Sequence, residues 1–333
     1  MAEWLVQDGI GERRAALVED GRLREIRLEW DDDPLLQPGA VLPARLLRRA
    51  DATGRGLIRL DGDLQALLSP VPAGLAEGAA LLVEIVREAL PEGEITKAVR
   101  AKPAAPGAEP RPAPDLLARL QASGVPLRRL DARARDLDAI GWTEAIEEAE
   151  SGLVTHPTLQ LRVSLTPAMT LIDVDGSLSP AVLAEAGARA AGAAIRLYDL
   201  AGSIGIDLPT VAGKAERQAA ALALDEALPP PFERTGVNGF GFLQLVRRRE
   251  RRSVMERLQA DRVGAAARAL LHGAERVEGA GPVTLVAHSR IAARIERQAN
   301  WAEQLAARLG APVVLRPDDR LAISAGYAVR AHV

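Results

Sequence analysis

Residues 165–176 read LTPAMTLIDVDG, an apolar stretch that ends in two aspartates. Side chains alternate along a strand, so Asp173 and Asp175 share a face with Leu171, about 7 Å apart along the chain. The opposite face, which carries Thr170 and Val174, suits a protein core. Carboxylates are costly to bury. The stretch therefore predicts a strand whose acidic end serves a purpose other than packing.

The segments around this stretch predict strands that alternate with helices. In order, the expected elements are a strand over 159–165, a helix over 179–197, a strand over 202–209, a helix over 214–228 and a strand over 240–252. Ser179 and Pro180 suit the N-cap and the first position of a helix. This order predicts parallel strands joined by right-handed crossovers.

Asp207 occupies a matching position near the end of the next strand, on the face opposite Ile204 and Ile206. If the two strands are parallel neighbours, Asp173 and Asp207 lie near the edge at which open α/β sheets bind ligands. Carboxylates that converge there repel one another unless protons or a divalent cation compensate. Oxygen ligands without His or Cys favour Mg²⁺, or Mn²⁺, over zinc. A plainer interpretation makes each aspartate a turn former or helix cap, and the repeated pattern weighs against it.

Two clusters of arginine are candidates for binding phosphate. The first contains one glutamate, Glu250, and five arginines, a local net charge of +4: Arg247, Arg248, Arg249, Arg251 and Arg252. The second, looser cluster consists of Arg45, Arg48, Arg49, Arg55 and Arg59. Charge runs are commonly solvated surfaces, and this interpretation is favoured for the second cluster. The first cluster follows a strand of the same sheet, which makes a phosphate-binding rim an equal alternative there.

Composition limits the class of protein. The chain has 333 residues, 48% of them hydrophobic and 26% charged, which allows two or three folded domains. It has no cysteine, which excludes disulfides, thiolate chemistry and cysteine zinc sites. No signal sequence or membrane span is expected, so the sequence predicts a soluble, cytoplasmic protein. The four histidines, expected to be structural, stand singly: His156, His272, His288 and His332.

The chain is expected to form a multidomain α+β and α/β protein. The predicted parts are an N-terminal hairpin over 1–35 packed on the core, a β-barrel over 36–102, a Pro-rich linker over 103–114, a core with a mixed or parallel sheet over 115–252 and a small α/β domain over 253–333. Asp20-Gly21 suits the turn of the hairpin. Five prolines between residues 103 and 114 suit an extended linker.

These motifs resemble the ribonuclease E/G family. The resemblance is strongest in TPAMTLIDVDGS (166–177), RLYDLAGSIGIDLP (196–209) and VNGFGFLQLVRRR (237–249), and extends to VTLVAHSRIAARI (283–295). It implies an RNase H/DNase I-like catalytic core, an inserted S1 (OB-like) barrel, and Mg²⁺-dependent endonuclease activity on single-stranded RNA such as ribosomal RNA precursors. Asp173 and Asp207 would bind the metal, with Asp175 as a further catalytic residue. The implied RNA contacts are Arg247, Arg248, Arg249, Phe240, Arg45 and Arg48.

The chain also departs from that family. Without cysteine it cannot form the family's zinc-linked dimer, and the Pro-rich linker replaces the segment that senses a 5′ monophosphate. Ile58 and Leu67 stand where aromatic side chains of an S1 surface are expected, and Gln244 stands where an acid is usual. The alternatives are therefore an inactive RNA-binding protein on the same scaffold and a structural protein without an RNA role.

Overall fold

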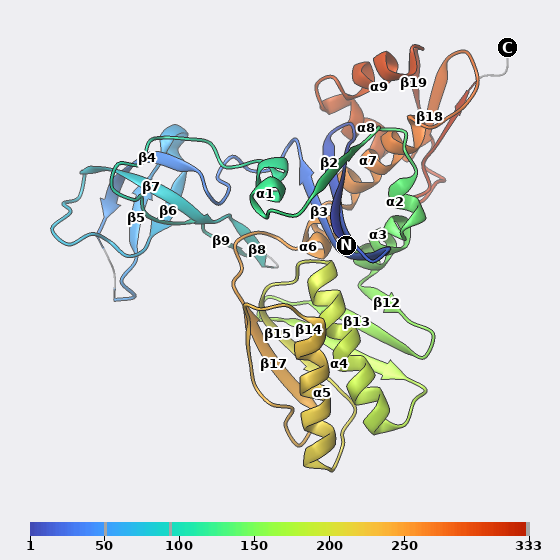
Figure 1. The fold of residues 1–333 in the computed structure, drawn as a ribbon. Helices are drawn as coiled ribbons and strands as arrows, with labels where there is room; N and C mark the ends of the chain where they lie inside the picture. Colours follow the sequence, from blue (N-terminus) through green and yellow to red (C-terminus); the bar gives the residue numbers. More distant parts are fainter. Residues whose placement is uncertain (50–51, 93–94, 331–333) are drawn as a thin grey trace.

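The computed structural model describes residues 1–49, 52–92 and 95–330 and has a mixed α/β, multidomain architecture (Figure 1). His332 and the last residues of the expected C-terminal strand lie outside the described residues. No helix in the described ranges is long and apolar enough to cross a membrane.

The N-terminal strands form a four-stranded sheet, in the order β11-β1-β2-β3. Its strands are β1 (Ala2–Asp8), β2 (Glu12–Glu19), β3 (Arg22–Trp30) and β11 (Leu127–Leu130). The hairpin at Asp20-Gly21 is confirmed, and both turn residues have positive φ. The hairpin pattern does not predict β1, which pairs with β2, or β11, which pairs with β1 in parallel. Helix α1 (Leu116–Ala122) packs Leu116 and Leu120 against this sheet.

The next segment forms a closed five-stranded barrel, in the order β10-β6-β5-β4-β7. Its elements are β4 (Val41–Arg48), β5 (Gly56–Arg59), the 3₁₀ turn η1 (Asp61–Asp63), β6 (Gln65–Leu68), β7 (Ala80–Arg87) and β10 (Arg100–Pro103). A short β8 (Leu90–Glu92) and β9 (Ile95–Lys97) ribbon extends from it. The barrel lies to one side of the other parts (Figure 1), and its closure is compatible with the expected OB-like barrel.

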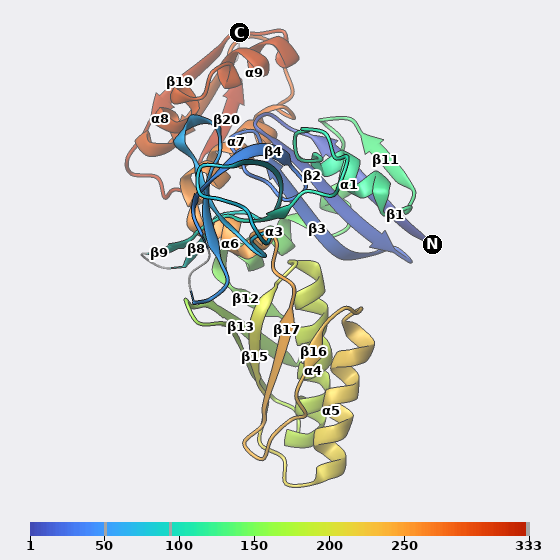
Figure 2. The ribbon, with the colours of Figure 1, turned by 90° about the vertical axis from the view of Figure 1, so that its left-hand side faces the viewer.

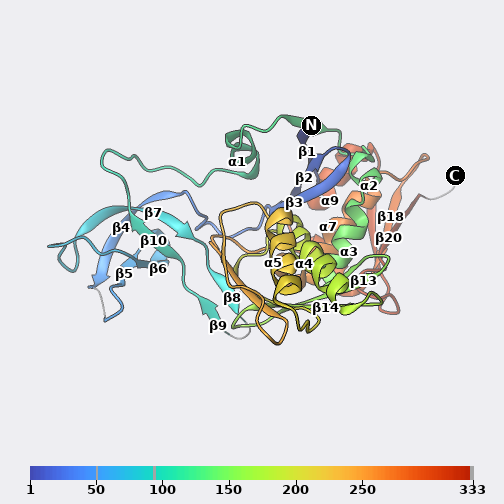
Figure 3. The same cartoon turned by 60° about the horizontal axis from the view of Figure 1, so that its bottom comes forward.

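The acidic strand lies at the centre of a six-stranded sheet, in the order β12-β13-β14-β15-β17-β16. These are β12 (Leu153–Thr155), β13 (Leu159–Leu165), β14 (Thr170–Gly176), β15 (Gly202–Asp207), β16 (Glu233–Arg234) and β17 (Phe242–Arg247). Two short helices, α2 (Asp136–Ala139) and α3 (Trp142–Ser151), precede the sheet. Helices α4 (Pro180–Leu197) and α5 (Lys214–Ala227) lie side by side on one of its faces (Figures 2 and 3).

The predicted parallel pairing is correct for β14 and β15 and wrong for β15 and β17, which are antiparallel. The chain does not cross over directly after α5. It first forms β16 at the sheet edge, turns through residues 235–241 and returns as β17 in a hairpin. β17 therefore runs away from the edge at which β15 ends.

The C-terminal part is a small α/β unit with its own apolar core. It consists of α6 (Val254–Ala260), α7 (Arg262–Ala274), β18 (Val283–Ala287), α8 (Ser289–Arg297), α9 (Trp301–Leu309), β19 (Val313–Pro317) and β20 (Tyr327–Arg330). The three strands form a sheet in the order β19-β18-β20. Trp301 and Leu305 of α9 are fully buried in this core.

Candidate functional site

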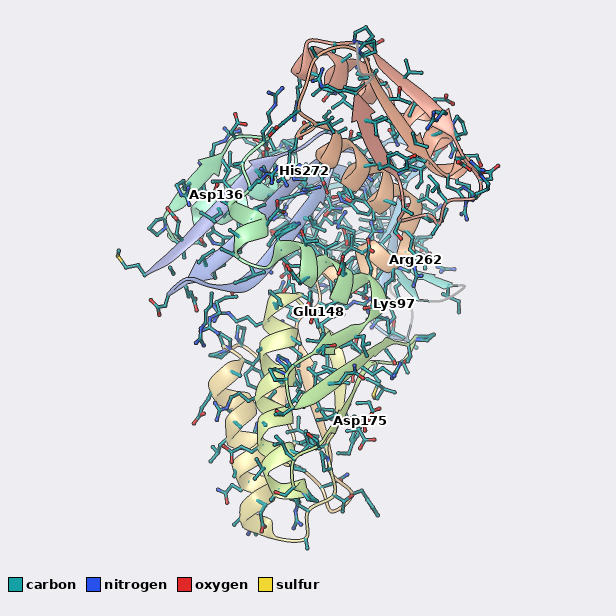
Figure 4. The ribbon with its side chains drawn as sticks, turned by 90° about the vertical axis from the view of Figure 1, so that its right-hand side faces the viewer. Lys97, Asp136, Glu148, Asp175, Arg262 and His272 are labelled. Carbon is teal, nitrogen blue, oxygen red and sulfur yellow. The ribbon has the colours of Figure 1, made fainter. Side chains whose placement is uncertain are left out.

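One face of the six-stranded sheet carries polar side chains and is not covered by α4 and α5. The covered face consists of buried apolar side chains, among them Ile172, Val174, Ile204 and Ile206. The side chains that alternate with them on the open face include Gln160, Arg162, Asp173, Asp175, Ser203, Asp207 and Gln244. Figure 4 shows Asp175 on the side of the sheet away from the two helices.

Asp173 and Asp207 are register partners on the neighbouring parallel strands β14 and β15. Neighbouring strands lie about 4.8 Å apart, so the two Cα atoms are close. Both residues are exposed, whereas Ile172 and Ile206, which precede them, are fully buried. Two carboxylates thus stand side by side on the open face, with Asp175 two positions further along β14.

The carboxylates influence one another. Burial and the negative charges of Asp175 and Asp207 raise the pKa of Asp173, while Arg162 and the backbone N–H of Val174 oppose the shift. The effect of Asp207 on the pKa agrees with the strand register, because like charges disfavour the ionised form. The site therefore attracts protons or cations.

The donor set suits a hard divalent cation, because every candidate ligand is a carboxylate oxygen. Asp173 and Asp207 can contribute one carboxylate each. Within the part of the chain that the structure describes, no group of three or more His, Cys, Asp and Glu side chains is arranged to hold a metal ion. A cation bound here would therefore take its remaining ligands from water or substrate, as Mg²⁺ commonly does.

Arg162 and Gln160 of β13 also lie beside the carboxylates, although the sequence motifs do not single them out. Arg162 is the register partner of Asp173, and Gln160 is that of Asp175. Arg162 therefore brings a positive charge to the carboxylates. The alternation in LQLRVSL (159–165) carried this signal, because it places Gln160 and Arg162 on one face of an adjacent strand.

Phe242 forms an apolar surface beside the carboxylates. It is the register partner of Asp207, and its ring covers Gly205. A Cβ atom on Gly205 would lie 2.4 Å from Cζ of Phe242 and 3.1 Å from Cδ2 of Leu171. Only glycine therefore lets the ring lie flat along the strand next to Asp207.

The turn over residues 235–241 presents Phe240 near the end of β15. The Asn238 side chain accepts hydrogen bonds from the backbone N–H groups of Phe240 (2.9 Å) and Phe242 (3.1 Å). The Leu208 N–H donates to the Gly241 carbonyl, 3.2 Å away, which attaches the turn to the segment after β15. The Phe240 residue is 84% exposed. An aromatic ring in this position can stack on a nucleobase.

The arginine run lies at the opposite end of the sheet from the carboxylates. Asp207 pairs with Phe242, whereas Gly202, at the start of β15, pairs with Arg247. The five intervening steps separate Arg247 from Phe242 by about 16 Å along the strand. The antiparallel direction of β17 produces this placement.

All three arginines named in the run as RNA contacts have protein partners, but they differ in exposure. Arg247 donates to the Leu200 carbonyl (2.7 Å), and burial lowers the pKa of its guanidinium. Arg249 binds the carboxylate of Glu256 in α6. The Arg248 side chain is 73% exposed and pairs with Glu250 at 2.9 Å. Of these three, Arg248 is the one best exposed to a ligand.

The barrel residues have mixed exposure. Arg45 and Arg48 of β4 are exposed, and Arg45 donates to the Gly78 carbonyl at 2.8 Å. Leu67 is half-buried, but Ile58 is fully buried in the barrel core. The expectation that Ile58 occupies a surface stacking position is therefore wrong. The two arginines remain available for binding phosphate.

A cavity of about 560 Å³ is lined by Trp30, Trp142 and His272 and does not include the carboxylates. Asp173 and Asp207 lie instead on an open sheet surface. Small-molecule sites are usually enclosed. An open surface with paired carboxylates and an exposed aromatic ring suits an extended polymer better than a small metabolite.

A comparison with models of known protein families gives no match, and a search of curated proteins finds no significant relative. The fold and the site define a multidomain α/β protein with a closed β-barrel and a carboxylate pair on an open sheet face.

Proposed function

We propose that this chain is a Mg²⁺-dependent endoribonuclease that hydrolyses phosphodiester bonds of single-stranded RNA. The observation that carries the proposal is the side-by-side placement of Asp173 and Asp207 on the uncovered face of the sheet. The resemblance to the ribonuclease E/G family supports it, and implies a cytoplasmic role in RNA processing, with ribosomal RNA precursors as natural substrates.

Asp173 and Asp207 would hold the Mg²⁺, and Mn²⁺ could replace it. When bound, the metal supplies an activated water for in-line attack and neutralises charge on the phosphate oxygens. Asp175 would orient that water by accepting a hydrogen bond. Arg162, opposite Asp173 on β13, would offset the charge that the phosphate brings to the carboxylates.

The other contacts would position the RNA strand. Phe240 and the ring of Phe242 offer stacking surfaces on the carboxylate side of the sheet. Arg248, Arg45 and Arg48 would bind backbone phosphates without reading the sequence of the bases. Arg247 and Arg249 would act indirectly, because they fix the segment that carries Arg248.

A second candidate is an RNA-binding protein of the same architecture without nuclease activity. One observation favours it: Gln244, where the resembled family has an acid, donates a hydrogen bond to the Ser203 hydroxyl at 3.1 Å. The open face therefore lacks a further carboxylate at this position. Binding without cleavage distinguishes this candidate from the nuclease.

The test is cleavage of a 5′-labelled single-stranded RNA in Mg²⁺. We expect Asp173→Asn and Asp207→Asn each to reduce the cleavage rate 100-fold or more, because metal stabilisation of the transition state contributes several kcal/mol, at about 1.4 kcal/mol per factor of ten. Asp225→Asn is the matched control, since Asp225 lies on α5 and pairs with Arg234.

Unchanged cleavage by Asp173→Asn would refute the assignment of the carboxylates. If the wild-type chain shifts the RNA on a gel but does not cut it in either Mg²⁺ or Mn²⁺, the RNA-binding candidate replaces the nuclease. If the chain fails to bind RNA even at low salt, both candidates fail.

A further inference from the structure

A second charged site lies where the Pro-rich linker meets β3, α1 and the loop after β17. Here a cavity of about 270 Å³ is lined by five arginines: Arg27, Arg119, Arg251, Arg252 and Arg257. Four acidic residues also line it, so arginines exceed carboxylates by one. The proposed nuclease function uses none of these residues.

The four acids of this cavity already have protein partners. Glu29 accepts a hydrogen bond from the Leu116 N–H, Asp33 from the Trp30 N–H and Asp115 from the Ala118 N–H, and Asp199 lies 3.7 Å from both Arg27 and Arg247. Asp115 also binds Arg13, at 3.0 Å. Asp115 and Asp199 therefore share their negative charge with arginines outside the cavity, whereas Asp33 binds Arg257 within it.

Arg251 has only neutral hydrogen-bond partners. It donates to the Pro38 carbonyl at 2.8 Å and to Oε1 of Gln37 at 3.4 Å. Among the described residues, no carboxylate lies within ion-pair distance of it. Burial lowers the pKa of Arg251, and the negative charge of Glu88, which binds Arg252, opposes this shift from beyond ion-pair distance. Half-buried guanidinium groups are normally paired with acids, so the hydrogen-bond donors of Arg251 can still take an anion.

Arg119 is the second cation of the cavity. It donates to the Pro114 carbonyl at 3.0 Å and lies 3.5 Å from the Glu29 carboxylate. Burial and the positive charges of Arg251, Arg257 and Arg27 lower the pKa of Arg119 to about 10. Repulsion among the arginines is therefore not fully compensated by Glu29, and a bound anion would relieve it.

We infer that this cavity binds a phosphate-type oxyanion, held between Arg119 and Arg251. Guanidinium groups bind such oxyanions through two parallel hydrogen bonds. The cavity, at about 270 Å³, lies near the lower end of the range of ordinary ligand pockets, about 300–1,000 Å³, and has room for a phosphate group. The anion would connect the linker at Pro114 to the loop that follows the sheet.

The phosphate group can come from solution or from an RNA backbone, and calorimetric titration separates the two sources. The wild-type chain is titrated in metal-free buffer with inorganic phosphate and, separately, with a short RNA that has hydroxyl ends. We expect Arg119→Gln and Arg251→Gln to weaken binding of the anion at least tenfold. Arg320→Gln is the control, because Arg320 is exposed and pairs with Asp318 outside the cavity.

The Tm of the wild-type protein gives a second test that needs no variant. It should rise when phosphate or RNA is bound. Asp173→Asn should bind inorganic phosphate as tightly as the wild type does, because Asp173 lies outside this cavity. Phosphate binding at the cavity can therefore be confirmed even if the nuclease proposal fails. Binding of RNA but not of inorganic phosphate, with loss in both cavity variants, would identify a backbone phosphate as the ligand. Absence of binding and of a Tm shift in the wild type, or equal binding by the cavity variants and the control, would overturn the inference.

Discussion

At the scale of single residues, the proposed metal site makes the metal-free protein less stable. Burial, Asp175 and Asp207 raise the pKa of Asp173, which means that the folded state disfavours its ionised form. A raised carboxyl pKa contributes stability below the ordinary value of 3.8, and this contribution is lost as the pH rises through the folded pKa. At neutral pH the carboxylates therefore repel each other at a cost in folding free energy.

We predict that Asp207→Asn stabilises the protein at pH 7 when divalent cations are chelated. Like charges directly opposite each other on neighbouring strands cost about 0.2–1 kcal/mol, and the amide removes one charge of the pair. The gain should shrink as the pH falls toward 3.8, because Asp173 then becomes neutral. Urea denaturation at several pH values in the presence of a chelator measures it.

Asp225→Asn should have the opposite effect, because the hydrogen bond with Arg234 lowers the pKa of Asp225. Its contribution to stability is present at neutral pH and is lost as the pH falls through the folded pKa. A stabilised but inactive Asp207→Asn protein would fit a functional carboxylate pair. Destabilisation by this substitution would indicate a structural role instead.

At the scale of elements, the turn between β16 and β17 holds Phe240 in an exposed position. Gly241 has a φ of +90°, and a Cβ atom there would lie 2.1 Å from the Leu208 carbonyl oxygen. Glycine is therefore required for the turn to approach the end of β15. Asn238 fixes the remaining backbone through its side chain.

We predict that Phe240→Ala weakens binding of single-stranded RNA by about 1–3 kcal/mol, the range for one base stacked on an aromatic side chain. Because Phe240 is 84% exposed, the free energy of unfolding should change by less than about 0.5 kcal/mol. Gel-shift titration in chelator measures the affinity. Phe240→Trp should retain binding, and equal affinity of the Ala and Trp variants would show that the ring does not contact RNA.

The elements that follow from local sequence patterns could be predicted. Alternation in TLIDV and the Ser179-Pro180 signal gave β14 and α4, and their order gave the parallel β14–β15 pair. The pairing of β11 with β1 could not be predicted. β11 is a strand of only four residues (127–130), and it pairs with a strand more than 100 residues earlier in the chain. Long-range pairing leaves little local signal.

The same limit applies to the candidate site. The strand pattern predicts that Asp173 and Asp207 lie near the same edge of the sheet, but their register is known only from the structure, and the position of the arginine run depends on the direction of β17. A hairpin at the sheet edge reverses that direction. Arg247 and Arg249 are also partly buried by partners from other elements, and a run of arginines in the sequence does not predict those contacts.

At the scale of the whole molecule, one arginine connects the N-terminal sheet to the small C-terminal unit. Arg268 of α7 is 1% exposed, and its guanidinium lies 4.2 Å from the ring centroid of Trp30 and 4.8 Å from that of Trp301. It donates to the Gly11 carbonyl at 2.9 Å and to Asp32 at 2.7 Å. Trp30 and Trp301 belong to separate apolar cores, so this side chain bridges them.

We predict that Arg268→Met destabilises the protein by about 1–3 kcal/mol, because it leaves the Gly11 carbonyl without its donor and Asp31 without its cation. Asp32 keeps its ion pair with Arg294. Arg268→Lys should recover only part of this loss, since an ammonium group cannot stack between two rings and donate along their edges at once. Arg320→Met, at an exposed arginine, should change stability by less than about 0.5 kcal/mol. Urea unfolding followed by the fluorescence of the chain's four tryptophans, which include Trp30 and Trp301, measures the change. If the free energy of unfolding of Arg268→Met lies within about 1 kcal/mol of the wild-type value, other contacts hold the two cores together and Arg268 contributes little to stability.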